Sequence, residues 1–101
     1  MSTSLRVLYP GSFDPIHFGH LDIIEQAHEL FGGVVVAIMH NHAKSAGLFD
    51  VDERVEMAAI ALAHLRGVSV VEQTGLAVQA AQRTDVDFIV NWQISNATDY
   101  L

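Results

Sequence analysis

Residues 11–20 read GSFDPIHFGH, and they stand between an apolar run and a helical pattern. The run before them, Leu5–Tyr9, is predicted to be a strand that ends at Pro10. The pattern after them predicts a helix from about Phe18 to Phe31, stopped by the glycine pair at positions 32 and 33. Residues 11–20 are therefore predicted to form a strand-to-helix turn, the place where parallel α/β folds bind phosphate groups.

The residue types of this turn suit a phosphate site. Gly11 lets the backbone approach a ligand closely, and His17 and His20 lie three residues apart, so that both can face one site. Neither the Rossmann glycine pattern nor the P-loop pattern is present. The alternative interpretation is a turn with two exposed histidines. The buried face of the following helix is predicted to consist of Leu21, Ile23, Ile24, Ala27, Leu30 and Phe31.

The chain then alternates between strand and helix patterns. Val34–Met39 is a continuous apolar run, which fits a strand buried on both faces. Residues 40–49 are predicted to be a loop. Asp50, with Glu53 three residues further on, predicts the start of a second helix. The apolar positions of that helix are Val51, Val55, Ala58, Leu62 and Leu65.

Two further elements complete the pattern. Val68–Val71 is predicted to be a third strand, a short third helix containing Leu76, Ala77, Ala80 and Ala81 follows Gly75, and Asp87–Val90 is predicted to be a fourth strand. The alternation indicates an α/β fold with a Rossmann-like parallel sheet, in three layers α/β/α, within one domain spanning residues 1–101.

The composition limits the function classes. Half of the 101 residues are apolar and 17% are charged, which is typical of a globular domain. No apolar run approaches the ~20 residues of a membrane span, and no signal segment begins the chain, so a cytoplasmic protein without membrane contact is expected. The chain has no cysteine, which excludes disulfides and thiolate chemistry. A net charge of −7 argues against a nucleic-acid partner.

Four segments resemble the phosphopantetheine adenylyltransferases of the nucleotidyltransferase superfamily. They are YPGSFDP at residues 9–15, NHAK at 41–44, LFDVDER at 48–54 and GLAV at 75–78. The resemblance runs from about Leu5 to Val90, and it implies transfer of AMP from ATP to 4′-phosphopantetheine in coenzyme A synthesis. It further implies Mg²⁺ bound with ATP, no metal site built from protein ligands, and association into a homo-oligomer.

The resemblance also implies roles for individual residues. Ser12 and the backbone of Phe13 would bind ATP phosphates, with Ser12 also reaching the acceptor substrate. His20, with His17 beside it, is the candidate catalytic residue, donating to an α-phosphate oxygen. Lys44 would bind the phosphate of phosphopantetheine, and Ala77 would line the pantetheine pocket.

Two departures keep alternatives open. His17 stands where the family usually has Thr, and His-x-Gly-His is typical of glycerol-3-phosphate cytidylyltransferases and nicotinamide-mononucleotide adenylyltransferases. NWQI at residues 91–94 replaces a segment with two cations, so Asn91 is only a weak candidate for substrate binding. The family chain also continues with a second ATP-binding signature. A truncated or inactive nucleotide-binding relative is therefore the alternative function.

Other charged and titratable residues receive structural interpretations. His40 and His42 are assigned to the loop surface in preference to a metal pair. His28 and His64 are expected to be surface residues or satisfied core residues. Arg54, which follows Asp52 and Glu53, is expected to form a structural ion pair.

Overall fold

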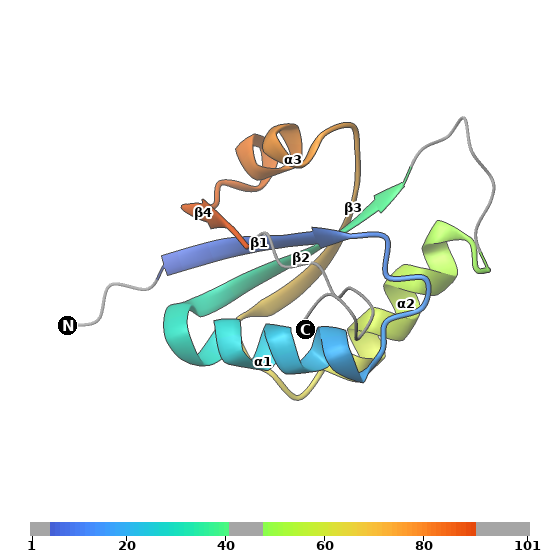
Figure 1. The fold of residues 1–101 in the computed structure, drawn as a ribbon, viewed down its shortest axis with the longest axis horizontal. Helices are drawn as coiled ribbons and strands as arrows, with labels where there is room; N and C mark the ends of the chain where they lie inside the picture. Colours follow the sequence, from blue (N-terminus) through green and yellow to red (C-terminus); the bar gives the residue numbers. More distant parts are fainter. Residues whose placement is uncertain (1–4, 41–47, 91–101) are drawn as a thin grey trace, which may run out of the picture.

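The computed structural model describes residues 5–40 and 48–90 as a parallel sheet flanked by helices (Figure 1). The sheet order is β3-β2-β1-β4, and each neighbouring pair is parallel. The predicted α/β fold with a parallel sheet is therefore confirmed. In chain order the elements are β1 (Leu5–Gly11), α1 (Phe18–Phe31), β2 (Gly32–His40), α2 (Val51–Leu62), β3 (Val68–Thr74), α3 (Ala77–Thr84) and β4 (Phe88–Ile89).

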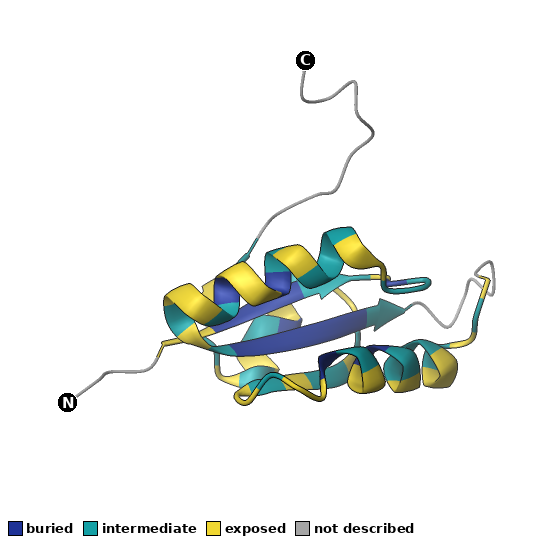
Figure 2. Cartoon of the chain, turned by 90° about the horizontal axis from the view of Figure 1, so that it is seen from below, coloured by how far each residue is buried: buried dark blue, intermediate teal, exposed yellow. Residues whose placement is uncertain are grey.

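The helices form layers on both sides of the sheet, as predicted. In Figure 1, α1 and α2 lie on one side of the strands and α3 lies on the other. Figure 2 shows the buried residues on the central strands and on the helix sides that face them. The layer beneath α1 and α2 includes the fully buried Val7, Ile24 and Val36, and the layer beneath α3 is built from Leu8, Val35, Ala37 and Ala80.

The β2 strand is central, as its continuous apolar run predicts. It pairs with β1 on one side and β3 on the other, and all five residues from Val34 to Ile38 are buried. Successive strand residues point to opposite faces. A strand with helices on both faces therefore needs apolar residues at every position.

The first two helices begin where the sequence predicts. His17 is the N-cap of α1, and Asp50 is the N-cap of α2, where its carboxylate accepts from Glu53 N at 2.9 Å. Gly32 ends α1 with φ of 89°, a conformation that a side chain disfavours, and the chain enters β2 at once.

The predicted end of the first strand at Pro10 is wrong, because β1 continues to Gly11. The carbonyls of Arg6 and Leu8 accept from β4 and its flanks, so even-numbered residues turn their backbone groups toward β4. Within the described residues, pairing with β4 covers only Val7 and Leu8 of β1. The missing N–H of Pro10 thus faces a side where the described residues form no ladder bond.

Leu30 was expected on the buried face of α1, but its side chain is 76% exposed. It lies six residues after the buried Ile24, which rotates it about 120° away around the helix. The apolar face predicted from the sequence therefore included one residue, Leu30, that points away from the core.

The third strand is longer than its apolar run, reaching Thr74 in place of Val71. Pairing with β2 holds the extension, since Met39 is opposite Gln73 and His40 is opposite Thr74. The same pairing corrects the placement of His40, which ends β2 and does not belong to a loop.

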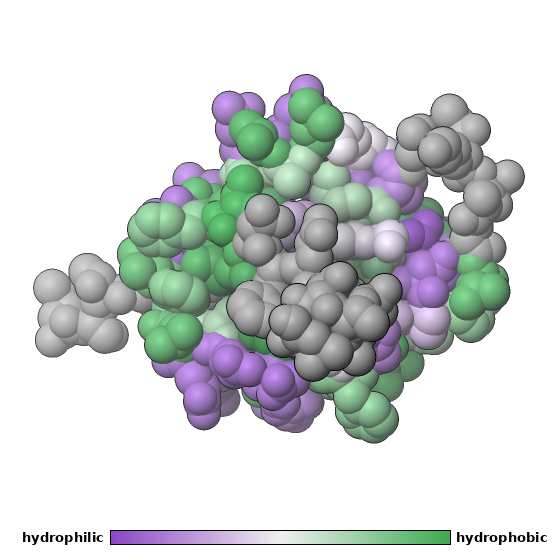
Figure 3. All heavy atoms as spheres, viewed as in Figure 1, coloured by the Kyte–Doolittle hydropathy of each residue, from purple (hydrophilic) through white to green (hydrophobic). Residues whose placement is uncertain are grey.

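The β4 strand has no neighbour on its outer side among the described residues. Phe88 is 55% exposed there, and Ile89 and Leu5 are also exposed. In Figure 3, green apolar atoms gather on the side where β4 and the start of β1 lie in Figure 1. No helix of the described part of the chain is long and apolar enough to cross a membrane.

Candidate functional site

The turn after β1 leaves the sheet where its strand order reverses. From β1, the chain passes through α1 to β2 on one side, whereas β4, reached through α3 on the opposite face, lies on the other side. In open parallel sheets this reversal separates the two crossovers and leaves a crevice beyond the carboxyl ends of the strands. Residues 12–20 follow directly after the carboxyl end of β1, which is where a turn that binds a ligand in this crevice has to begin.

His17 and His20 form a compact pair at the start of α1. Their rings stack with centroids 3.7 Å apart. Nδ1 of His17 accepts from Gly19 N at 3.1 Å, and Nδ1 of His20 accepts from His17 N at 3.1 Å. The pair therefore caps two backbone donors of the helix, with a histidine in each half of the reciprocal capping arrangement.

These bonds define the chemistry that His20 offers. Partial burial, reinforced by the neighbouring His17, lowers the pKa of His20 from 6.5 to about 4, so the ring is neutral near pH 7. Because Nδ1 accepts a backbone N–H, the ring proton is assigned to Nε2. A neutral His20 can thus donate one hydrogen bond through Nε2 without carrying charge.

Phe13 anchors the turn beneath the histidines. Its ring is 2% exposed and lies 5.3 Å from Tyr9 and 4.7 Å from His20, both in edge contacts. Phe13 adopts φ of 47°, which is uncommon outside glycine. A Cβ at Gly11 would come within 3.0 Å of the Phe13 ring. The absence of a side chain at Gly11 therefore leaves space for the Phe13 ring, and this requirement does not depend on any ligand.

Arg54 contacts the turn from α2, and the predicted ion pair is wrong. Its Nη1 donates to the carbonyl oxygen of Ser12 at 3.0 Å, and it makes no ion pair within the described residues. Its Nε is buried and has no hydrogen-bond partner in the described part of the chain. Asp52 and Glu53 precede Arg54 on α2, where residues one and two apart do not face each other.

The side chain of Asp14 in turn contacts the segment that leads into α2. Its Oδ2 accepts from Leu48 N at 2.8 Å, and its Oδ1 accepts from Phe49 N at 2.9 Å. These two donors directly precede Asp50, the cap of α2. The turn after β1 and the start of α2 are thus joined by three hydrogen bonds, all donated by residues 48–54 and accepted by residues of the turn.

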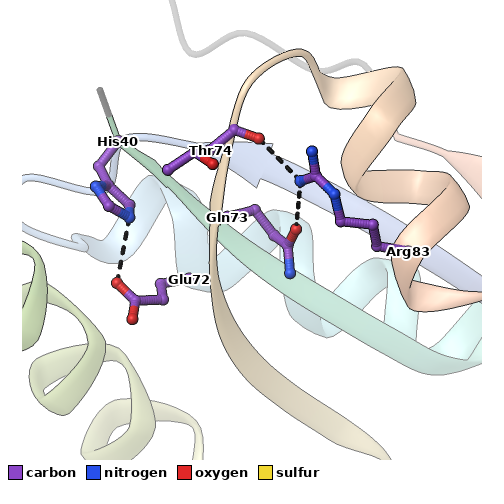
Figure 4. Close-up of a pocket in the computed structure, with 5 residues that line it drawn as sticks. All are labelled: His40, Glu72, Gln73, Thr74 and Arg83. Atoms are coloured by element: carbon purple, nitrogen blue, oxygen red, sulfur yellow. Dashed lines mark hydrogen bonds and ion pairs between the residues drawn. The ribbon is translucent and has the colours of Figure 1, made fainter. Parts of the chain in front are cut away.

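A hollow of about 500 Å³ opens at the carboxyl ends of β2 and β3 (Figure 4). On one side His40, 12% exposed, points to Glu72, with its Nε2 3.2 Å from a carboxylate oxygen. On the other side Arg83 extends from α3, and its Nη1 donates to Gln73 Oε1 at 2.8 Å and to the Thr74 carbonyl at 2.9 Å. Sequence patterns did not single out Glu72, Gln73, Thr74 or Arg83.

The sequence-predicted residues fall into three groups. Ser12, Phe13, His17 and His20 lie together on the turn after β1. Ala77 is the first residue of α3 and does not line the hollow. Lys44, His42 and Asn91 lie outside the described residues.

The remaining histidines have structural partners. His28 Nε2 lies 2.6 Å from the Arg66 carbonyl, and the exposed His64 lies 3.7 Å from Glu25. Within residues 5–40 and 48–90, no group of three or more His, Cys, Asp or Glu side chains is arranged to hold a metal ion.

Comparison of the sequence with known proteins gives one consistent group. The family model described as cytidylyltransferase-like matches residues 8–98. The chain is 48% identical over 86 residues to the phosphopantetheine adenylyltransferase of Prochlorococcus marinus (strain MIT 9303), covering 85% of this chain and 54% of the relative. It is 53% identical over 78 residues to the enzyme of that name from Gloeobacter violaceus (strain ATCC 29082 / PCC 7421), covering 77% and 48%. The chain thus spans about half the length of the curated relatives that it matches.

Proposed function

Since the chain belongs to the cytidylyltransferase-like family, we propose that it acts as a pantetheine-phosphate adenylyltransferase. The reaction transfers AMP from ATP to 4′-phosphopantetheine and yields dephospho-CoA and pyrophosphate. A relative with that name is identical at 48% of the 86 matched residues. The observation that carries the proposal is the paired His17 and His20 at the start of α1, where the sheet order reverses.

His20 is proposed to stabilise the transferring phosphoryl group. A phosphate oxygen of the acceptor attacks the α-phosphorus of ATP, a new P–O bond forms, and the bond to the leaving pyrophosphate breaks. Negative charge grows on the α-phosphate oxygens during this displacement, and a fixed donor aimed at them lowers the barrier. The Nε2–H of His20 supplies such a donor, because Nδ1 is fixed by the backbone.

The start of α1 is proposed to hold the ATP phosphates. Its first turn contains no acidic residue, so the positive end of the helix dipole is not neutralised. The Ser12 hydroxyl and the Phe13 N–H would contribute further donors. Ser12 is exposed, and Phe13 N–H meets no acceptor among the described residues. His17 would act beside His20, as the stacked contact suggests.

The acceptor is proposed to bind toward β2 and β3. Lys44 follows β2 in the sequence and would hold the acceptor phosphate as a point charge. The hollow lined by His40 and Arg83 lies at the carboxyl ends of β2 and β3, and Ala77 begins α3, the helix that carries Arg83. Asn91 follows β4 in the sequence and offers only a neutral amide, which makes its contribution the weakest.

Magnesium is proposed to enter as part of the substrate, bound to the phosphates of ATP. It retains several waters and needs few protein ligands. We further propose a single domain over residues 1–101, a cytoplasmic location, a homo-oligomer, and no nucleic-acid partner. The net charge of −7 supports the last of these.

His17 favours CTP as a second candidate nucleotide, because a histidine at this position is typical of cytidylyltransferases. Calorimetric titration of the chain with ATP, CTP and phosphopantetheine, each with magnesium, tests the proposal. Binding of ATP and phosphopantetheine is expected. Binding of CTP without ATP would transfer the proposal to a cytidylyltransferase, and no binding of any of the three would overturn it.

A further inference from the structure

We propose that Arg54 is a positioning residue that aims the backbone N–H of Phe13 at the phosphate site by holding the Ser12 carbonyl. This role rests on the proposed function, because a phosphate must occupy the site. Nη1 of Arg54 donates to that carbonyl at 3.0 Å, from α2. Because the described contact of Arg54 is with the Ser12 carbonyl, it would act through the peptide that joins residues 12 and 13.

Peptide geometry transmits the contact. The bond between Ser12 and Phe13 is trans and planar, so its C=O and N–H point in opposite directions. Fixing the oxygen toward α2 therefore directs the Phe13 N–H away from α2. This N–H donates to no acceptor among the described residues, although Phe13 is only 2% exposed. Backbone donors on buried residues rarely lack partners, which points to a ligand or an ordered water as the acceptor.

The start of α2, which carries Arg54, is itself held by the turn. Asp14 accepts from Leu48 N and Phe49 N, so the turn itself holds the segment that leads into α2. Asp50 then caps the helix, and Arg54 N donates to the Asp50 carbonyl at 3.0 Å. Asp14 of the turn thus holds the start of α2, and Arg54 of α2 holds the carbonyl of Ser12, two residues before Asp14.

The peptide that Arg54 holds is followed by a residue with a strained backbone conformation. Phe13 adopts φ of 47°, and the buried ring contacts with Tyr9 and His20 fix its side chain. A residue in this region keeps its conformation only where surrounding contacts hold it, and the bond from Arg54 to the Ser12 carbonyl is one of those contacts. The buried Nε of Arg54 makes no bond that could share this task within the described residues.

The experiment compares Arg54→Lys and Arg54→Gln with Arg66→Lys and Arg66→Gln. Arg66 is an exposed arginine whose side chain has no hydrogen bond or ion pair among the described residues. Residual dipolar couplings of the Phe13 amide are measured without ligand, and ATP affinity is measured by calorimetry with magnesium. Arg54→Lys keeps the charge and serves if Arg54→Gln does not fold.

We expect the Phe13 amide coupling to change in the Arg54 variants while couplings in β2 stay the same. We also expect their ATP affinity to fall roughly threefold to tenfold, the effect of one hydrogen bond, and both values to stay unchanged in the Arg66 variants. An unchanged Phe13 coupling, or a changed coupling with unchanged ATP affinity, would overturn the role of Arg54. Failure of the unaltered chain to bind ATP would overturn the proposed function, and the coupling would still report on the Arg54 contact.

Discussion

Nδ1 of His20 accepts the backbone N–H of His17 at 3.1 Å, and the two rings stack with centroids 3.7 Å apart. His17 therefore contributes to the site in two ways, as a backbone donor that fixes the tautomer of His20 and as a ring that fixes its plane. Its own Nδ1 is occupied by Gly19 N. The first histidine of the pair is thus part of the support of the second, whether or not it also contacts substrate.

Replacing His17 tests the capping role. His17→Ala is expected to lower the free energy of unfolding by about 0.5–2 kcal/mol, because Gly19 N loses its acceptor at the start of α1. His17→Asn is expected to retain most of the stability, because asparagine is a strong N-cap. Urea unfolding followed by circular dichroism measures both. Equal destabilisation by alanine and asparagine would contradict the capping role.

The lowered pKa of His20 predicts a pH dependence of stability. The unfolded chain binds a proton near pH 6.5 and the folded chain only near pH 4, so the free energy of unfolding falls as the pH drops through this window. Solvent screening of a partly exposed ring limits the loss to roughly 1–2 kcal/mol.

Thermal unfolding of the chain and of His20→Asn between pH 4 and pH 7 measures this effect. The variant is expected to lose less stability on acidification than the unaltered chain. His64→Asn is the matched control, since His64 is exposed on α2's flank and lies 3.7 Å from Glu25. Parallel curves for the chain and for His20→Asn would contradict a lowered pKa at His20.

Asp14→Asn is expected to destabilise the chain by about 1.5–3 kcal/mol. The carboxylate accepts two backbone donors, Leu48 N and Phe49 N, and an amide can accept only one of them. Asp22→Asn is the control, because Asp22 accepts from Gln26 on the exposed surface of α1 and should cost well under 1 kcal/mol. Urea unfolding that ranks the two variants equally would show that the Asp14 contacts add no stability.

Much of the fold was predictable because its signals are local. The cap of α2 by Asp50 and Glu53 needs residues only three apart, and the apolar run of β2 identifies a central strand by itself. The strand-to-helix turn was predicted from ten consecutive residues. In each case one short segment contains the whole physical reason.

The contacts that support the site were not predictable in this way. Asp14 meets Leu48 across 34 residues, and Arg54 meets Ser12 across 42 residues. No periodicity relates positions so far apart, and the neighbouring Asp52 suggested an ion pair instead. His40 was missed for a similar reason, because the apolar run ends before it while backbone pairing with Thr74 continues.

The most direct test of the account is pyrophosphate release from ATP and phosphopantetheine, measured at high protein concentration for the chain and for His20→Ala. The resemblance implies cations at the positions of Asn91 and Ile94, so a slow rate that requires both substrates is expected. His20→Ala should lower that rate by about 10²–10³-fold, because one preorganised donor to the α-phosphate is lost. His64→Ala should leave it unchanged. A rate unaffected by His20→Ala would contradict the central claim that His20 stabilises the transferring phosphoryl group.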